Sequence, residues 1–171
     1  MIRLDRHEWI QLRKRVENRN QKEKAIVERL LPFLKNAKKI GVYIPIQGEV
    51  DVYSKLEMSY DLYVPKVVDD TTMVFCQNKH LQKGKFNVLE PDIQFAIQKE
   101  ELDVIIVPIV AFDHLHRSGY GKGYYDRYLK DCTALKIGVA FDQQEVQLQV
   151  QPWDVDMDYI LTETKTIGGK Q

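Results

Sequence analysis

Residues 117–129, RSGYGKGYYDRYL, combine a glycine-rich loop with a segment of helical character. Three loop positions lack a Cβ, which permits positive φ angles and close approach of a ligand to the backbone. They are Gly119, Gly121 and Gly123. A loop that leads into a helix N-terminus presents unpaired N–H groups and partial positive charge to an anion. Arg117 and Lys122 add two full charges. We therefore interpret this segment as a phosphate-binding loop.

The residues around the loop allow more than one interpretation. The GxGxG spacing is neither a Walker A loop nor the dinucleotide fingerprint, so the glycines alone could also mark a tight turn. Asp126 could be a dipole partner in the first helical turn, or it could hold magnesium beside bound phosphates. Tyr124 and Tyr125 could pack in the core or stack on a flat heterocycle. His114 and His116 lack a nearby third ligand, which favours a simple turn over a metal site.

Helices and buried strands in alternation must position the loop. The periodicity predicts an N-terminal helix over about residues 5–36, with a break or a second short helix at Pro32. We further predict strands at 40–45, 61–67, 72–77, 103–108, 136–141 and 158–163, short helices within 48–58 and 123–131, a loop at 80–100 and a disordered tail at about 166–171.

This order predicts one domain over 1–171 with an α/β fold, a three-layer sandwich around a mostly parallel sheet. Ligands of such sheets bind outside the carboxyl ends of the strands. The apolar run at 103–108 is typical of a central parallel strand. The glycine loop follows it, so we expect the loop to lie at that edge of the sheet.

Composition and charge limit the class of protein. The chain has 171 residues, of which 44% are hydrophobic, and this is typical of a globular protein. The first residues show no signal-peptide pattern, and the apolar run Val104–Phe112 is too short to span a bilayer. Cys76 and Cys132 belong to no metal or redox motif and indicate a reducing compartment. We therefore expect a cytoplasmic protein.

The net charge is zero but is unevenly distributed. Residues 1–40 hold 12 Lys and Arg against 5 Asp and Glu, whereas the segment 137–164 holds no Lys or Arg. A basic first helix could bind a polyanion, and an acidic last segment could hold a divalent cation. The alternative is two solvated faces that partly neutralise each other.

Taken together, these residues resemble a known family. The segment 107–129, VPIVAFD followed by R-x-G-x-G-x-G-YYDRYL, closely resembles the signature of the 5-formyltetrahydrofolate cyclo-ligases, also called methenyltetrahydrofolate synthetases. Three more stretches match in the expected order: YIPIQGEVD (43–51), YVPKV (63–67) and PWDVDMDYILTE (152–163). The resemblance covers essentially the whole chain, although the first 35 residues match only loosely.

The resemblance implies a fold of the ribose-phosphate isomerase and CoA-transferase type. It also implies conversion of 5-formyltetrahydrofolate, with ATP and magnesium, to 5,10-methenyltetrahydrofolate, ADP and phosphate. In that reaction the formyl oxygen attacks the γ-phosphate, nitrogen 10 of the folate closes the ring and phosphate leaves. Such a route needs alignment and charge neutralisation rather than a side-chain nucleophile.

The resemblance further implies roles for individual residues. The catalytic residues would be Arg117, Lys122 and Asp126. The ATP-binding residues would be Arg3, Arg6, Arg117, Gly119, Tyr120, Gly121, Lys122, Gly123, Tyr124 and Tyr125. The folate-binding residues would be Ile44, Glu49, Lys66, Tyr120, Gly121, Lys122, Gly123 and Tyr124. The magnesium ligands would be Asp126 and Asp158, with Asp154 and Asp156 as nearby alternatives to Asp158.

Two of these assignments have simpler alternatives. A carboxylate at Glu49 would pair with the N–H donors of the folate pterin, but it could also be an acid at a helix N-terminus. Lys66 could equally be a solvated surface lysine.

The chain also departs from the family pattern. The turn before Arg117 is one residue shorter and lacks the usual glycine, and Ser118 stands where Leu or Ile is expected. The Lys and Arg that the family places four residues apart near the N-terminus correspond here to Arg3 and Arg6, or to Arg13 and its neighbours.

Two rival functions follow from the same residues. One is an enzyme of this fold that acts on another formyl or amide substrate, and the other is a non-catalytic module that binds RNA through its basic first helix. Glu49 beside a complete glycine loop favours the cyclo-ligase. The apolar periodicity of the first helix favours packing on the sheet over RNA binding. We therefore expect small-molecule substrates, no nucleic-acid or membrane partner, and a monomer or weak dimer.

Overall fold

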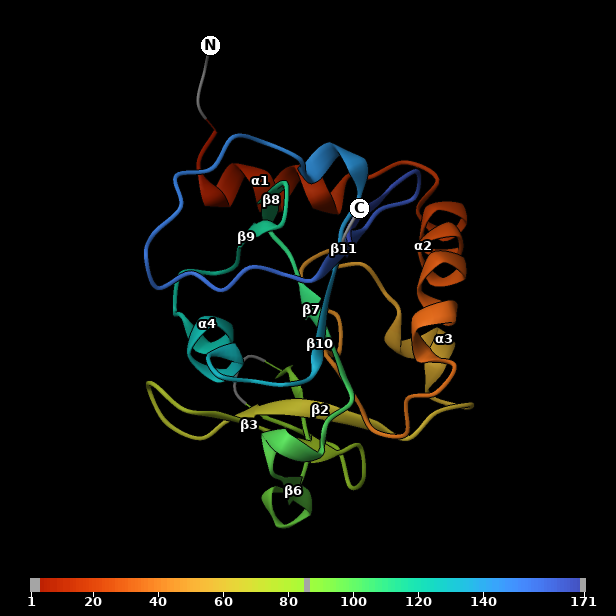
Figure 1. Cartoon of the computed structure of the whole chain (residues 1–171), viewed down its shortest axis with the longest axis vertical. Coiled ribbons are helices and arrows are strands. Elements are labelled where there is room, and N and C mark those ends of the chain that lie inside the picture. Colours follow the sequence, from red (N-terminus) through yellow and green to blue (C-terminus); the bar gives the residue numbers. More distant parts are fainter. Residues whose placement is uncertain (1–3, 85–86, 170–171) are drawn as a thin grey trace.

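An eight-stranded sheet runs through the middle of the protein in the order β12-β11-β10-β7-β1-β2-β3-β6. The structure, a computed structural model, describes residues 4–84 and 87–169. Strands β11, β10, β7, β1 and β2 pair in parallel, whereas β12 and β3 run antiparallel to their inner neighbours. The predicted α/β fold with a mostly parallel sheet is therefore confirmed (Figure 1).

The helices are α1 (Arg6–Lys14), α2 (Arg19–Leu34), α3 (Tyr53–Leu56) and α4 (Tyr124–Leu129), with short 3-10 turns η2 (Ile93–Phe95), η3 (Lys99–Glu101) and η4 (Asp142–Gln144). The strands of the main sheet are β1 (Ile40–Val42), β2 (Leu62–Val67), β3 (Met73–Gln77), β6 (Ala96–Ile97), β7 (Val104–Pro108), β10 (Leu135–Val139), β11 (Tyr159–Leu161) and β12 (Thr166–Gly168). Two hairpins lie outside it, β4 (Gln82–Lys83) with β5 (Leu89–Glu90) and β8 (Ala111–Asp113) with β9 (His116–Ser118).

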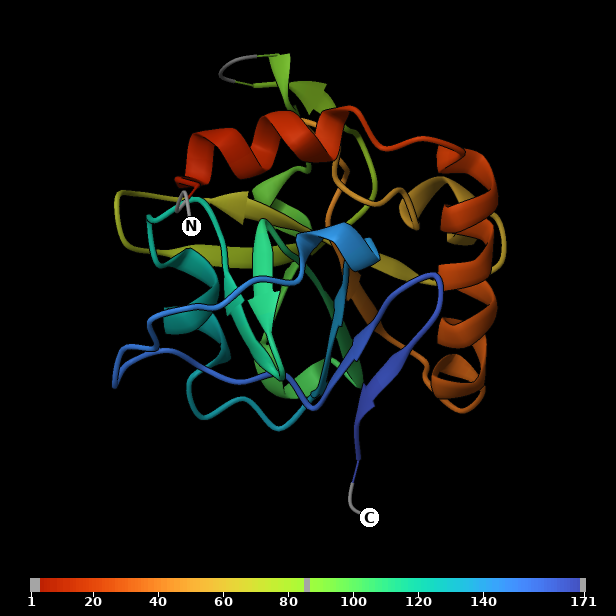
Figure 2. The ribbon, with the colours of Figure 1, turned by 90° about the horizontal axis from the view of Figure 1, so that it is seen from above.

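Alternation along the strands creates a core on each face of the sheet. In β7, Val104 and Ile106 belong to one apolar cluster, and Ile105 and Val107 belong to the other, because successive strand residues point to opposite faces. The first cluster includes the buried face of α2, and the second includes residues of α4. Helices α2 and α4 accordingly lie on opposite sides of the strands in both views (Figures 1 and 2).

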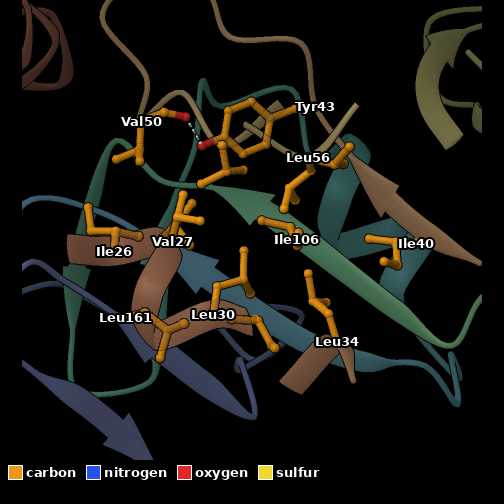
Figure 3. Close-up of a cluster of buried hydrophobic side chains, with 14 of the residues drawn as sticks. Ile26, Val27, Leu30, Leu34, Ile40, Tyr43, Val50, Leu56, Ile106 and Leu161 are labelled. Carbon is orange, nitrogen blue, oxygen red and sulfur yellow. Dashed lines mark hydrogen bonds between the residues drawn. The ribbon is translucent and has the colours of Figure 1, made fainter. Parts of the chain in front are cut away.

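The core that α2 covers is densely apolar. Leu30 and Leu34 of α2 are buried against Ile106 of β7 and Leu161 of β11 (Figure 3). Truncation of such a leucine to alanine typically costs about 2–5 kcal/mol. At the edge of this core the Tyr43 hydroxyl donates to the Val50 carbonyl, which satisfies a buried polar group close to the carboxyl end of β1.

The N-terminal region forms two helices, so the prediction of one helix over 5–36 is wrong. The chain turns between α1 and α2, where Asn18 adopts a left-handed conformation with φ of 54°, a conformation that asparagine tolerates better than most residues. The guanidinium of Arg19 donates to the Arg13 carbonyl at 2.7 Å, which caps the end of α1. Pro32 does not break α2, which continues to Leu34, although the proline has no N–H to donate to the carbonyl of Glu28.

The predicted disordered tail is also wrong for residues 166–168, which form the edge strand β12. Ile167 pairs with Ile160 of β11. The Thr162 N–H donates to the Lys165 carbonyl at 2.9 Å and closes the turn between the two strands. The expectation for residues 170–171 lies outside the described residues.

The remaining differences are short elements. The predicted loop at 80–100 contains β4, β5, β6 and two 3-10 turns. The hairpin β8–β9 arises where no strand is expected, and its turn at His114 has a φ of 55°. Within the described residues, no helix combines the length and apolar character that crossing a membrane requires.

Candidate active site

A pocket of about 880 Å³ opens at the carboxyl ends of the central parallel strands. Tyr43 and Ile44 line it directly after β1, and Pro108 lines it at the end of β7. Helix α1 crosses this edge of the sheet and contributes Arg6 and Trp9 (Figure 1). The volume lies within the range of small-molecule sites. The pocket therefore lies where the sequence places the glycine loop.

The glycine loop joins β9 to α4 and forms one wall of the pocket. Gly121 and Gly123 have φ of 90° and 73°, which L residues rarely adopt. A Cβ at Gly121 would lie 2.8 Å from Nη1 of Arg6, and a Cβ at Gly119 would collide with Nη2 of Arg117. The glycines thus let two guanidinium groups approach the loop backbone, so backbone N–H groups and cations share one surface.

Arg117 is the most unusual of these cations. Its side chain is buried, with 8% exposed, and its Nε has no hydrogen-bond partner in the part of the chain that the structure describes. Burial lowers the pKa of the guanidinium, while the nearby Asp126 carboxylate opposes that shift. The guanidinium also lies over the ring of Tyr125, 5.4 Å from its centroid. A buried cation that lines a pocket is suited to binding an anion.

Two further cations belong to the same wall, and one expected cation cannot be placed. Arg6 and Lys122 line the pocket. Arg3, the other N-terminal candidate, lies outside the described residues. Arg13 does not line the pocket and is fully buried behind it.

Glu49 lines another part of the same pocket. It lies in the segment between β1 and α3, with only 5% of its surface exposed. Its Oε1 accepts a hydrogen bond from the Ile46 N–H at 2.9 Å. Burial raises the pKa of Glu49 to about 7, although the Ile46 amide, the Arg13 charge and the Tyr120 hydroxyl favour the ionised form. A carboxylate in this setting can accept two N–H donors from a planar ligand.

The acidic residues divide between the pocket and the opposite edge of the sheet. Asp126 and Asp154 both line the pocket, and Oδ1 of Asp126 accepts from the Val155 N–H at 3.1 Å. Asp158 precedes β11 at the amino ends of the strands, where its Oδ2 accepts from the Lys136 N–H at 2.8 Å. The expectation that Asp158 holds a metal with Asp126 is therefore wrong, and Asp154 is the neighbour that lies in the pocket.

Other acidic and basic groups near the pocket are already paired. His116 lines the pocket and contacts Asp156 with 2.5 Å between Nδ1 and Oδ1. Nδ1 of His114 lies 2.9 Å from Oδ1 of Asp113. Across residues 4–84 and 87–169, no three His, Cys, Asp or Glu side chains gather as a ready-made metal site. Magnesium commonly uses only one or two carboxylates together with substrate phosphates, so Asp126 and Asp154 fit that ion.

Lys66 is not a pocket residue, in contrast to the expectation. Its neighbours Pro65 and Val67 line the pocket, whereas Lys66 points to the other face because strand residues alternate. Its Nζ lies 3.3 Å from Oε2 of Glu90. Lys66 can therefore act on the pocket only through Glu90, which does line it.

The core-packing interpretation of the loop tyrosines is confirmed, and their stacking on a ligand stays a prediction. Tyr124 and Tyr125 pack against the apolar core under α4 and also line the pocket. Sequence reasoning missed Trp9 and Trp153 as lining residues. Trp153 remains 69% exposed. Its position inside the matching PWDVD stretch was the signal that could have identified it, since exposed tryptophan is uncommon away from binding surfaces.

The fold and pocket define an α/β protein with a glycine loop and a buried carboxylate on one pocket. Comparisons with known proteins point to a single family. The family model of the 5-formyltetrahydrofolate cyclo-ligase family matches residues 3–163. A 5-formyltetrahydrofolate cyclo-ligase of Mycoplasma pneumoniae is 32% identical over 153 residues, covering 82% of this chain and 84% of that protein. One from Escherichia coli K12 is 30% identical over 143 residues, covering 74% and 78%.

Solved structures agree with these relatives. The 5,10-methenyltetrahydrofolate synthetase of Aquifex aeolicus superposes with a TM-score of 0.81 at 31% identity, covering 97% of this chain and 93% of that one. The synthetase of Mycoplasma pneumoniae gives 0.75 at 29% identity, covering 92% and 96%. The chain belongs to the 5-formyltetrahydrofolate cyclo-ligase family, as the sequence motifs predict.

Proposed function

We propose that this enzyme converts 5-formyltetrahydrofolate and ATP to 5,10-methenyltetrahydrofolate, ADP and phosphate. One observation carries the proposal: the buried Arg117 guanidinium shares a pocket with the buried Glu49 carboxylate. The first suits a phosphate chain, and the second suits the N–H edge of a pterin. Family membership supports the same reaction.

ATP phosphates bind at the glycine loop in this proposal. Backbone amides around Gly121 and the side chains of Arg6, Arg117 and Lys122 surround that part of the pocket. Fixed donors of this kind stabilise the charge on a transferring phosphoryl group without reorganisation during the reaction. Asp126 and Asp154 would hold magnesium, which supplies further charge neutralisation at the phosphates.

The folate binds toward Glu49. The carboxylate accepts N–H donors of the pterin, and Ile44, Pro65 and Val67 supply apolar surface. The aromatic rings of Tyr124 and Trp153 lie on the same pocket and can stack on the rings of the folate.

The chemistry then depends on alignment. The formyl oxygen bonds to the γ-phosphorus while the bond from that phosphorus to ADP breaks. Nitrogen 10 next attacks the formyl carbon and loses its proton, and the carbon–oxygen bond breaks as the oxygen departs on inorganic phosphate. Phosphorylation is needed because the oxygen of an amide-like formyl group is otherwise a poor leaving group. The protein contributes by holding the two reactants in line, which can supply several kcal/mol of the barrier.

The proposal is tested by mixing the protein with 5-formyltetrahydrofolate and MgATP and following the absorbance of the methenyl product. We expect a rate far above that of the mixture without protein, and no reaction without ATP. A rate equal to the protein-free mixture would reject the proposed function. Cys76 and Cys132 are free and buried, which suits a reducing compartment, so we expect the enzyme to act in the cytoplasm. We also expect a monomer or weak dimer.

A further inference from the structure

Arg13 connects three segments around the pocket without lining it. Its Nη1 donates to the Ile109 carbonyl at 2.9 Å, just beyond the end of β7. Its Nε and Nη2 both donate to the Gln47 carbonyl, at 3.1 and 2.8 Å, two residues before Glu49. Its Nη2 also donates to the Tyr120 hydroxyl at 2.8 Å, in the glycine loop. One guanidinium thus joins the central strand, the Glu49 segment and the glycine loop.

The bonds from Arg13 to Gln47 lead toward Glu49. Gln47 directly follows Ile46, whose N–H donates to Oε1 of Glu49 at 2.9 Å. Tyr120 and Glu49 line the same pocket. Arg13 therefore donates both to the glycine loop, at the Tyr120 hydroxyl, and to the segment that holds the Glu49 side chain, at the Gln47 carbonyl.

Tyr120 is placed to respond to both ends of the pocket. Its backbone lies between Gly119 and Gly121, in the loop that takes phosphates in the proposed function. Its hydroxyl accepts from Arg13, which also donates to the Gln47 carbonyl at the folate end. A ligand that orders the glycine loop restricts Tyr120, and through Arg13 it restricts the segment that holds Glu49. Ligands that reduce the same motion bind with positive cooperativity.

We propose that Arg13 is a positioning residue that couples nucleotide binding to folate binding, because it joins Tyr120 of the glycine loop to the Gln47 carbonyl beside Glu49. This inference rests on the proposed function, because it assigns the two ends of the pocket to those two substrates. The coupling is reciprocal, so folate strengthens nucleotide binding by the same factor.

A purely structural role for Arg13 makes a different prediction. The bonds to Ile109 and Gln47 are sufficient to anchor α1 to the sheet. The bond to Tyr120 adds nothing to that anchor. Tyr120→Phe removes only the hydroxyl of a residue that is 37% exposed, so it leaves the anchor in place. A structural role would therefore leave the coupling between substrates unchanged in this variant.

The test is calorimetric titration of the full-length protein with 5-formyltetrahydrofolate, with and without saturating MgADP. We expect MgADP to tighten folate binding about 10-fold in the unmodified protein, within the usual range of coupling between sites. In Tyr120→Phe we expect that factor to fall to roughly twofold or less. Arg13→Lys keeps the charge but loses the fork that reaches Gln47 and Tyr120 together, so it should lower the factor as well.

Tyr128→Phe is the control, because it removes a tyrosine hydroxyl that has no hydrogen-bond partner in the described parts of the chain. It should keep the full MgADP effect. A full effect in Tyr120→Phe would overturn the inference, and so would an unmodified protein that forms methenyl product but binds the two ligands independently. Failure to form that product would instead reject the proposed function.

Discussion

Arg117 and Arg13 are both buried, yet replacing each with methionine should have opposite effects on stability. Arg117 leaves its Nε unpaired in the described structure, whereas Arg13 donates four hydrogen bonds. Replacing a poorly compensated buried charge with an apolar residue of similar volume is often neutral or stabilising, by about 1–4 kcal/mol. Loss of the contact with the Tyr125 ring offsets roughly 0.5–2 kcal/mol of that gain.

Arg117→Met should therefore raise the free energy of unfolding by about 0–2 kcal/mol, and the melting temperature by up to about 4–8 °C. Activity should change in the other direction. Loss of a charge-assisted hydrogen bond to phosphate is worth about 1.5–3 kcal/mol, so kcat/KM for ATP should fall roughly 10- to 150-fold. Arg13→Met should instead destabilise the protein by about 1–3 kcal/mol or more, because it leaves the buried Gln47 carbonyl unpaired.

Calorimetric melting and steady-state kinetics on both variants decide the matter. A lower melting temperature for Arg117→Met together with unchanged kinetics for ATP would show that Arg117 is a structural residue. That result would refute the reasoning that a buried cation in this pocket marks the phosphate site.

Three further outcomes are expected. Asp126→Ala should lose most turnover and remain folded, since phosphate charge would go unneutralised. Asp158→Asn should instead retain kcat and lower the melting temperature. Equal losses of kcat in the two variants would contradict this division. Burial raises the pKa of Glu49 from 4.5 to about 7. Between those pH values the native state binds more protons than the unfolded state. The contribution of Glu49 to the free energy of unfolding therefore falls as pH rises from about 4.5 to 7. Over the same pH range the ionised fraction of Glu49 grows, so kcat/KM for folate should rise with pH. Glu49→Gln should abolish that rise and weaken folate binding more than ATP binding. An unaltered pH profile in this variant would count against a role for the carboxylate. Gly121→Ala should raise KM for ATP at least several-fold, because its φ of 90° and the nearby Arg6 exclude a methyl group; unchanged affinity for ATP would show that the loop shape is not needed.

The position of the site could be predicted from the sequence because it depends on local patterns. An unalternated apolar run identifies β7 as a central strand, and the segment after such a strand must emerge at the ligand-binding edge of the sheet. The glycines and Glu49 then follow from their places after β9 and β1. These features need no knowledge of how distant side chains pack.

The choice among the aspartates could not be predicted in that way. Asp154, Asp156 and Asp158 recur at every second position, so residue type and spacing do not separate them. The start of β11 at Tyr159 decides the matter, because it fixes Asp158 at the amino end of the strand. Strand boundaries depend on tertiary pairing with β10 and are the least certain feature of any sequence-based prediction.

The burial of Arg13 could have been predicted from its helical spacing. It lies three residues after Ile10 and three before Val16, both of which are buried, so helical spacing places it on the apolar face of α1. In a run of three basic residues, Arg13 to Arg15, the sequence alone suggested interchangeable surface charges. Only the carbonyls of Gln47 and Ile109, which are distant in sequence, explain why the first of them is buried.

The central claim is that the formyl oxygen of the folate is phosphorylated by ATP in this pocket. It is tested most directly with 5-formyltetrahydrofolate that carries ¹⁸O in the formyl group, incubated with the enzyme and MgATP, followed by mass spectrometry of the released phosphate. We predict one ¹⁸O atom in each phosphate formed with methenyl product. Unlabelled phosphate accompanying that product would contradict the account, because water rather than the formyl oxygen would then have taken the phosphoryl group.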